Sequence, residues 1–308
     1  MPKLYPKIKA YKTKYYDVGN NIRVYVEFYG NPKGFPAIYL HGGPGDKTTP
    51  VNARLFNPKK YNIVLMDQRG CGKSTPGILH NTTKHLIQDM ETIRKDIGAD
   101  KWLVTGGSWG ASLAMLYAQA EPKHTSGLIL RGYTDLYYHR KNFDLVMRGM
   151  IPQYLDKLYK TVGLNYLKHT EKDMTRAYTK KLKTKNRKTR KKYLEIFCDS
   201  SDHHITSKAH KDSMTDMENL AAVNCHYLKH DWFLKPRQMT LEKNVKKIKH
   251  IPTTFVQGRF DFICPQVMAY EMHKRLPKSK LVVVQAGHTV SDIEVAEALV
   301  KASDEYKT

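Results

Sequence analysis

The sequence has no long hydrophobic run. No window approaches the 18 consecutive apolar residues that indicate a membrane-spanning helix, so we expect neither a membrane span nor a membrane partner. The first 16 residues are cationic and no apolar segment follows them, which argues against a secretory signal. The expected location is therefore cytoplasmic.

Cysteine is scarce and dispersed. The chain has four cysteines, none of them in C-x-x-C spacing: Cys71, Cys198, Cys225 and Cys264. Four cysteines could pair in three ways, but without a secretory signal reduced thiols are favoured. A composition of 41% hydrophobic and 26% charged residues excludes a disordered or fibrous chain and indicates a globular protein.

Acidic residues are too few to balance the basic ones. The chain has 29 Asp and Glu against 52 Lys and Arg, a net charge of +23, and residues 136–240 alone hold 22 basic and 11 acidic residues. Within the run 180–192, nine of 13 residues are basic. Such a run can bind a polyanion, but no nucleic-acid motif or aromatic platform accompanies it, so a solvated helical face is favoured. We therefore disfavour nucleic acid as a partner, but the basic run does not exclude it.

Short β-branched runs alternate with longer amphipathic ones, which predicts a mostly parallel, doubly wound α/β sheet covered by helices. The strands are expected at 22–29, 37–40, 63–67, 102–105, 128–130, 253–256 and 280–284, and helices at 80–97, 111–120, 266–275 and 291–302. The alternation stops after Asp135 and resumes near Ile251. We therefore interpret residues 1–135 and 241–308 as the core domain and 136–240 as an inserted, Lys-rich helical cap.

The motif Gly106-Gly107-Ser108-Trp109-Gly110 lies directly between a predicted strand and a predicted helix. In this context G-x-S-x-G is typical of a sharp turn that exposes a nucleophilic serine, and the glycines leave room for the bend. The alternative is a glycine-rich loop without chemistry. The flanking pattern favours Ser108 as a nucleophile.

A serine nucleophile needs a base and an acid that orients it, and in strand–turn–helix hydrolases the chain order is Ser, Asp or Glu, then His. Asp261 and His288 follow predicted strands in that order. Taken singly, Asp261 could be a turn or capping residue and His288 a surface histidine. Their joint placement favours a triad, with Asp135 as the reserve candidate for the acid.

The string His41-Gly42-Gly43-Pro44-Gly45 follows another predicted strand. A glycine-rich turn exposes backbone N–H groups, so it can supply one donor to an oxyanion while the N–H of Trp109 supplies the other. His41 is interpreted as holding the turn.

Two further patterns fail as cofactor sites. Gly72-Lys73-Ser74 ends like a phosphate-binding loop, but the motif requires glycine where Asp67 stands. The cysteines and histidines of the cap lack the spacing of a zinc site. We expect no metal and no organic cofactor.

Together these strings resemble the proline iminopeptidases (prolyl aminopeptidases), serine peptidases of the α/β-hydrolase fold. The matching strings are HGGPG at 41–45, DQRGCGKSTP at 67–76, GGSWGASLAMLYAQAEP at 106–122, LRG at 130–132, GRFDFICP at 258–265 and AGH at 286–288. The resemblance implies a triad of Ser108, Asp261 and His288, with an oxyanion hole at Gly43 and Trp109. It also implies release of an N-terminal proline from a short peptide through an acyl-enzyme, without a cofactor.

The resemblance is weaker where the family binds the substrate's free ammonium group. The family usually places two cap glutamates there; Asn224 stands at one position and Cys198 at the other, and Tyr133 lies near a displaced pocket aromatic. The acidic side chains that could compensate are Asp199, Asp202 and Glu218. We therefore predict a weaker preference for a free amino terminus than the family shows. The alternatives are a diverged amidase or esterase of the same fold, or a polyanion-binding protein built on it.

Overall fold

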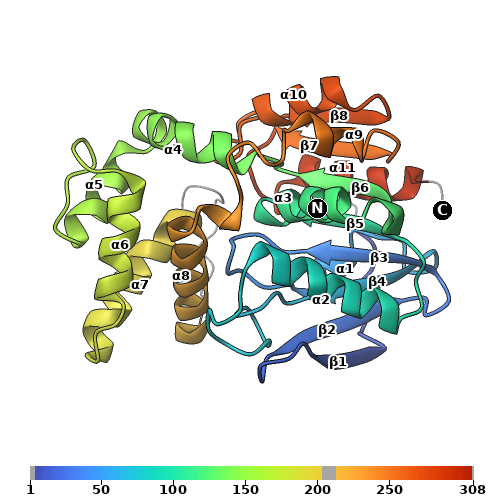
Figure 1. The fold of residues 1–308 in the computed structure, drawn as a ribbon, viewed down its shortest axis with the longest axis horizontal. Helices are drawn as coiled ribbons and strands as arrows, with labels where there is room; N and C mark the ends of the chain where they lie inside the picture. The colour runs from blue at the N-terminus through green and yellow to red at the C-terminus, as the bar shows by residue number, and fades with distance from the viewer. Residues whose placement is uncertain (1–3, 203–212, 307–308) are drawn as a thin grey trace.

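We describe the chain from a computed structural model, which covers residues 4–202 and 213–306; the side chains of 139–145 and 199–202 are not described. One eight-stranded sheet organises the molecule, in the order β1-β2-β4-β3-β5-β6-β7-β8 (Figure 1). The pairs β1–β2 and β2–β4 are antiparallel and all later pairs are parallel. The strands are β1 Lys12–Asp17, β2 Arg23–Gly30, β3 Phe35–Leu40, β4 Tyr61–Met66, β5 Trp102–Gly107, β6 Thr125–Arg131, β7 Thr253–Gly258 and β8 Ser279–Val284.

The central strands are buried on both faces, which explains their continuous apolar runs. All six residues of β4 and of β5 are buried. Because side chains alternate along a strand, Trp102 and Val104 enter one apolar cluster while Leu103 enters the cluster on the other face.

Helices cover both faces of the sheet. Helices α2, α3 and α10 contribute to one cluster, and α1 and α11 contribute to the other. Their bounds are α1 Pro50–Ala53, α2 Thr83–Asp96, α3 Trp109–Ala120, α9 Glu242–Lys246, α10 Val267–Arg275 and α11 Ile293–Glu305, with a short 3-10 helix η1 at Pro122–His124. None of the helices in the described ranges has both the length and the apolarity to cross a membrane.

Between β6 and β7 the chain leaves the sheet and forms a group of helices beside it (Figure 1). They are α4 Leu136–Met150, α5 Pro152–Thr161, α6 Glu171–Lys181, α7 Arg187–Asp202, α8 Met214–Lys229 and the 3-10 helix η2 Asp231–Phe233. Apolar residues of α4 to α8 form a cluster of their own, which includes Leu155, Tyr178 and Phe197. We use the name cap for these helices, and the division into a core domain and an inserted cap at 136–240 stays a prediction.

The predicted mostly parallel, helix-covered sheet is confirmed. Each predicted strand and helix is present, with ends that differ by a few residues. The sequence pattern missed β1, because this edge strand is largely exposed and reads as cationic rather than apolar.

Candidate active site

Ser108 lies on the turn between β5 and α3, and its backbone has φ 58° and ψ −126°. A positive φ is costly for a residue with a Cβ atom, and such conformations concentrate at functional sites. The Ser108 N–H donates to the carbonyl of Arg131 at 2.8 Å, which ties the turn to the end of β6.

The glycines of the motif are required by the close approach of neighbouring backbone. A Cβ atom at Gly106 would clash with the carbonyl oxygen of Gly110, and a Cβ at Gly110 would clash with that of Leu40. The sharp turn that presents Ser108 therefore depends on both glycines.

Asp261 and His288 form a buried pair at the ends of β7 and β8. His288 Nδ1 lies 2.7 Å from Asp261 Oδ2, and the Cys264 N–H donates to Asp261 Oδ1 at 2.8 Å. Burial on its own raises the pKa of Asp261, but the charge and hydrogen bond of His288, the Cys264 N–H and the charge of Arg131 outweigh it, so the pKa lies below its ordinary value. Asp261 is therefore ionised at neutral pH.

Arg131 holds the other side of the imidazole. Its Nη1 lies 3.2 Å from His288 Nε2 and donates to the His288 carbonyl at 2.8 Å. Since guanidinium only donates, this contact is a hydrogen bond when His288 is neutral with its proton on Nδ1, facing Asp261. This is the tautomer that a general base toward serine needs.

No hydrogen bond joins Ser108 to His288, although the structure describes both side chains. The end of β6 lies next to both residues. The Ser108 N–H donates to the Arg131 carbonyl, and a Cβ atom at the next residue, Gly132, would lie 3.1 Å from His288 Cε1. The Ser108 hydroxyl lies beside the thiol of Cys264. Sequence reasoning missed Arg131 and Cys264 as site residues, although both stand in the strings that carried the resemblance.

The reserve acid, Asp135, has a different use. It accepts a hydrogen bond from the Tyr138 N–H at 2.8 Å and caps the N-terminus of α4. The Asp135 carboxylate therefore serves as the N-terminal cap of α4.

The glycine-rich turn lies against the serine. A Cβ atom at Gly42 would lie 3.3 Å from Ser108 Cβ, and within the described residues neither the Gly43 nor the Trp109 N–H donates to another backbone group. Two backbone donors without a backbone partner beside a candidate nucleophile can stabilise an oxyanion.

Gln68 fixes the position of this turn. Its N–H donates to His41 Nε2 at 3.0 Å, its side-chain amide donates to the His41 carbonyl at 2.9 Å, and its side-chain oxygen accepts from Trp109 Nε1 at 2.8 Å. His41 is thus used in holding the turn.

The three substrate-binding candidates have different surroundings. Tyr133 is fully buried and packs against Phe255 of the core, with ring centroids 5.3 Å apart. Cys198 is buried in the apolar cluster of the cap. Asn224 is half-buried on α8.

The placement of Asn224 follows from helical spacing. Leu220 backbone atoms touch Gly45 of the glycine-rich turn, and the Tyr227 ring packs on Trp109 with centroids 5.1 Å apart. Residues four before and three after a helical position share its face, so Asn224 lies on the face of α8 that carries Tyr227.

Of the acidic side chains that could compensate for a neutral Asn224, the structure describes that of Glu218. Glu218 pairs with Arg190 at 3.0 Å. The side chains of Asp199 and Asp202 lie outside the described part of the chain.

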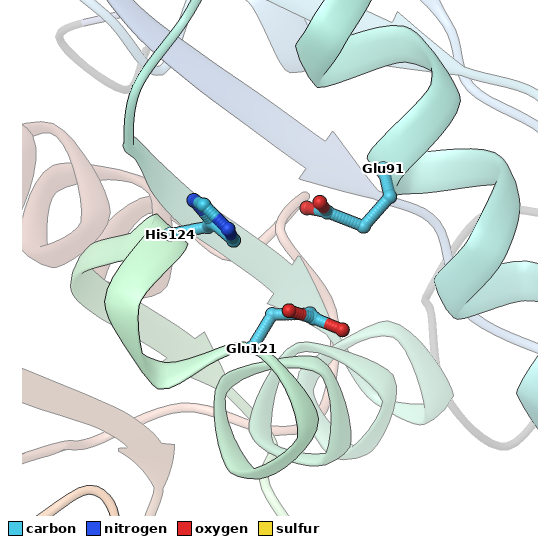
Figure 2. A group of neighbouring side chains, drawn as sticks. All are labelled: Glu91, Glu121 and His124. Carbon is cyan, nitrogen blue, oxygen red and sulfur yellow. The ribbon is translucent and has the colours of Figure 1, made fainter.

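One group of side chains has the composition of a metal site. Glu91, Glu121 and His124 bring potential ligand atoms within 4.8 Å of one another, from α2, the residue after α3 and the 3-10 helix η1 (Figure 2). Glu91, however, already accepts from Arg94 at 2.8 and 2.7 Å and from the Tyr117 hydroxyl at 2.6 Å. Because a metal would have to compete with this paired carboxylate, we assign none to the group.

Comparison with known proteins identifies the family of the chain. The family model described as the alpha/beta hydrolase fold matches residues 36–294. A protein named probable proline iminopeptidase from Leptolyngbya boryana is 35% identical, over 99% of this chain and 97% of its own length. Proline iminopeptidases of Arabidopsis thaliana and Neisseria gonorrhoeae are 34% and 33% identical over 99% and 98% of this chain, and over 82% and 98% of their own lengths.

Solved structures share the fold at lower identity. A proline iminopeptidase from Mycobacterium smegmatis has a TM-score of 0.61 at 14% identity, over 95% of this chain and 97% of its own. An esterase from Exiguobacterium antarcticum has a TM-score of 0.61 at 19% identity, over 96% of this chain and 100% of its own. By its full-length sequence identity to the curated relatives, the chain belongs to the alpha/beta hydrolase fold family and, within it, to the proline iminopeptidase family.

Proposed function

We propose that this protein is a prolyl aminopeptidase, a serine hydrolase that releases N-terminal proline from short peptides. One observation carries the proposal: the strained turn of Ser108 lies beside two N–H groups without a backbone partner and a buried Asp261–His288 pair. Relatives that are 33–35% identical over nearly the whole chain and bear the name proline iminopeptidase support the substrate class.

In the proposed reaction His288 acts as the base. Its Nε2 takes the proton of the Ser108 hydroxyl while the oxygen attacks the scissile carbonyl, and Asp261 stabilises the imidazolium that forms. For this step Nε2 has to exchange its contact with Arg131 for one with Ser108, which a side-chain rotation of Arg131 would permit.

The oxyanion of the tetrahedral intermediate would accept from the N–H groups of Gly43 and Trp109. Donors held in place by the fold cost nothing to reorganise during the reaction, and loss of one such donor typically costs about 2.7–4 kcal/mol of transition-state stabilisation. The Gln68 contacts to His41 and Trp109 would keep both donors in position.

Collapse of the intermediate would transfer the His288 proton to the leaving amine and leave proline esterified to Ser108. Water, deprotonated by His288, would then hydrolyse the acyl-enzyme. Each step uses groups of this chain and water, so the proposal requires no metal or organic cofactor.

We also propose a cytoplasmic location. All four cysteines are buried free thiols, which fits a reducing compartment.

Substrate selectivity is where the chain departs from its family. Recognition of a free ammonium group in a partly buried site needs a compensating carboxylate. Asn224 of α8, which stands where the family usually places a glutamate, is neutral. A diverged amidase or esterase with little need for a free amine is therefore the second candidate function.

The experiment that separates the two candidates compares proline 2-naphthylamide with its N-acetylated analogue on the purified protein. We expect faster hydrolysis of the free-amine substrate, measurable hydrolysis of the acetylated one, and no hydrolysis of either by Ser108→Ala. Equal or faster hydrolysis of the acetylated substrate would favour the amidase or esterase. A strong preference for the free amine would contradict the predicted loss of selectivity. Retained turnover in Ser108→Ala would contradict the proposed nucleophile.

A further inference from the structure

The strongest surface feature outside the site is the run 180–192, which we call the basic tip. It comprises the end of α6, the turn after it and the start of α7. In Figure 1 this turn lies at the outer end of the cap, away from the sheet. It carries nine Lys and Arg and no acidic residue.

Most of these cations have no carboxylate partner among the side chains that the structure describes. Arg190 pairs with Glu218 at 3.0 Å, and Lys191 lies 3.5 Å from Glu195. The other seven are exposed and form no ion pair with any described carboxylate: Lys180, Lys181, Lys183, Lys185, Arg187, Lys188 and Lys192. The folded structure therefore maintains a cluster of like charges that repel one another.

The fold points these charges outward. Leu194 and Phe197 of α7 are buried in the cap cluster, which fixes the inner face of this helix. Lys188 and Lys192, one turn apart, lie on the opposite face. Because packing fixes the orientation of the helix, a ligand that binds there has less backbone motion to restrict.

The chemistry of the basic tip favours phosphates over lipid or bases. Within residues 180–192, all of which the structure describes, Leu182 is the only large apolar side chain, and it is half-buried. Insertion into a membrane interface needs an exposed apolar face, which is missing. Base stacking needs an exposed aromatic ring, and none lies in this run.

We propose that the basic tip binds the phosphate backbone of double-stranded nucleic acid, without sequence preference, at a site separate from Ser108. Binding would release the counterions condensed on the duplex and would weaken steeply with salt. The turn after β5 that holds Ser108 takes no part in this binding. Hydrolysis of a small uncharged substrate should therefore not depend on the basic tip.

Two variants with the same charge change test whether binding is local. The first replaces Lys180, Lys183, Lys185, Lys188 and Lys192 of the tip with glutamine. The second, the control, replaces five exposed lysines of the core with glutamine: Lys7, Lys9, Lys33, Lys59 and Lys278. Fluorescence anisotropy with a labelled 30-base-pair DNA measures affinity at several salt concentrations.

For the tip variant we expect affinity to fall at least about tenfold at 0.1 M salt. The slope of log K against log salt should become shallower by about 0.9 for each phosphate that the variant no longer neutralises. The control variant should stay within about threefold of the parent, and all three proteins should hydrolyse a naphthylamide substrate at the same rate.

Three results would overturn the proposal. Equal losses of affinity in both variants would assign binding to net charge alone. If the parent did not bind the duplex at 0.1 M salt, the basic tip would not be a nucleic-acid site. Tighter binding to vesicles containing phosphatidylserine than to the duplex, abolished in the same tip variant, would assign the tip to membranes. Unchanged hydrolysis together with any of these results would leave the proposed peptidase activity intact.

Discussion

The carboxylate of Asp261 is almost inaccessible to solvent, yet it stays ionised because of its partners. His288 Nδ1 at 2.7 Å, the Cys264 N–H at 2.8 Å and the nearby charge of Arg131 together outweigh the cost of burial. The contact with Asp261 also favours the neutral His288 tautomer with its proton on Nδ1, so in the proposed mechanism the electrostatics of Asp261 and the reactivity of Ser108 are linked.

Asp261→Asn should preserve the size of the side chain but remove its charge and permit the wrong imidazole tautomer. We expect kcat to fall by about 10⁴-fold while the fold is retained, because the imidazolium would lose its stabilising partner. Kinetics with a naphthylamide substrate and circular dichroism check this. A loss smaller than about tenfold would show that another carboxylate orients His288.

The lowered pKa of Asp261 also sets the pH dependence of its contribution to stability. A carboxyl whose pKa is lower in the folded state contributes stability above its unfolded pKa and loses it as the pH falls through the folded value. The difference in unfolding free energy between the parent and Asp261→Asn should therefore not shrink as the pH falls from 7 to 5, and should shrink only below about pH 4. Denaturant unfolding at several pH values measures it, and a difference that already shrinks at pH 6 would contradict the lowered pKa.

Candidate triad residues could be predicted from sequence because each stands next to a recognisable strand end. Ser108 has its glycine motif, and Asp261 and His288 follow strands in the expected order. Arg131 could not be assigned in the same way, since its contact with His288 depends on how β6 aligns with the loop after β8. Register between strands that are distant in sequence leaves no local pattern.

At the scale of elements, the turn between β5 and α3 depends on how closely the start of α3 approaches β3. A Cβ atom at Gly110 would meet the carbonyl of Leu40, the last residue of β3. Backbone on both sides leaves little freedom to relax, so this contact positions Ser108 against the glycine-rich turn.

Gly110→Ala should lower the unfolding free energy by at least about 2 kcal/mol through overpacking, and activity should fall with it. The matched control is Gly149→Ala in α4, where a Cβ atom would meet nothing within 4 Å. Since alanine is the better helix former, the control should be neutral or stabilising by about 0.5 kcal/mol. Equal effects of the two changes in denaturant unfolding would contradict the close approach.

Strands and helices of the sheet layer were predictable because burial on both faces gives a continuous apolar run. Strand β1 was not predicted because it lies at the edge of the sheet. Of its six residues only Tyr16 is buried, so it has no continuous apolar run. The helices of the cap were expected as a group, but their ends were not, because a Lys-rich composition hides helical periodicity.

At the scale of the whole molecule, the cap and the core meet around the glycine-rich turn. Lys47 pairs with Asp216 of α8 at 2.6 Å, and Leu220 of the same helix touches Gly45. Helix α8 therefore joins the cap to the turn that would hold the oxyanion. By contrast, the basic tip lies at the other end of the cap, so the two proposed sites can be altered separately.

The most direct test of the serine-hydrolase account is active-site labelling with a fluorophosphonate, followed by intact-mass measurement and peptide mapping. The predicted result is one adduct per chain, located on Ser108 and absent in Ser108→Ala. An adduct on another serine, or an unlabelled protein that still hydrolyses proline 2-naphthylamide, would contradict it.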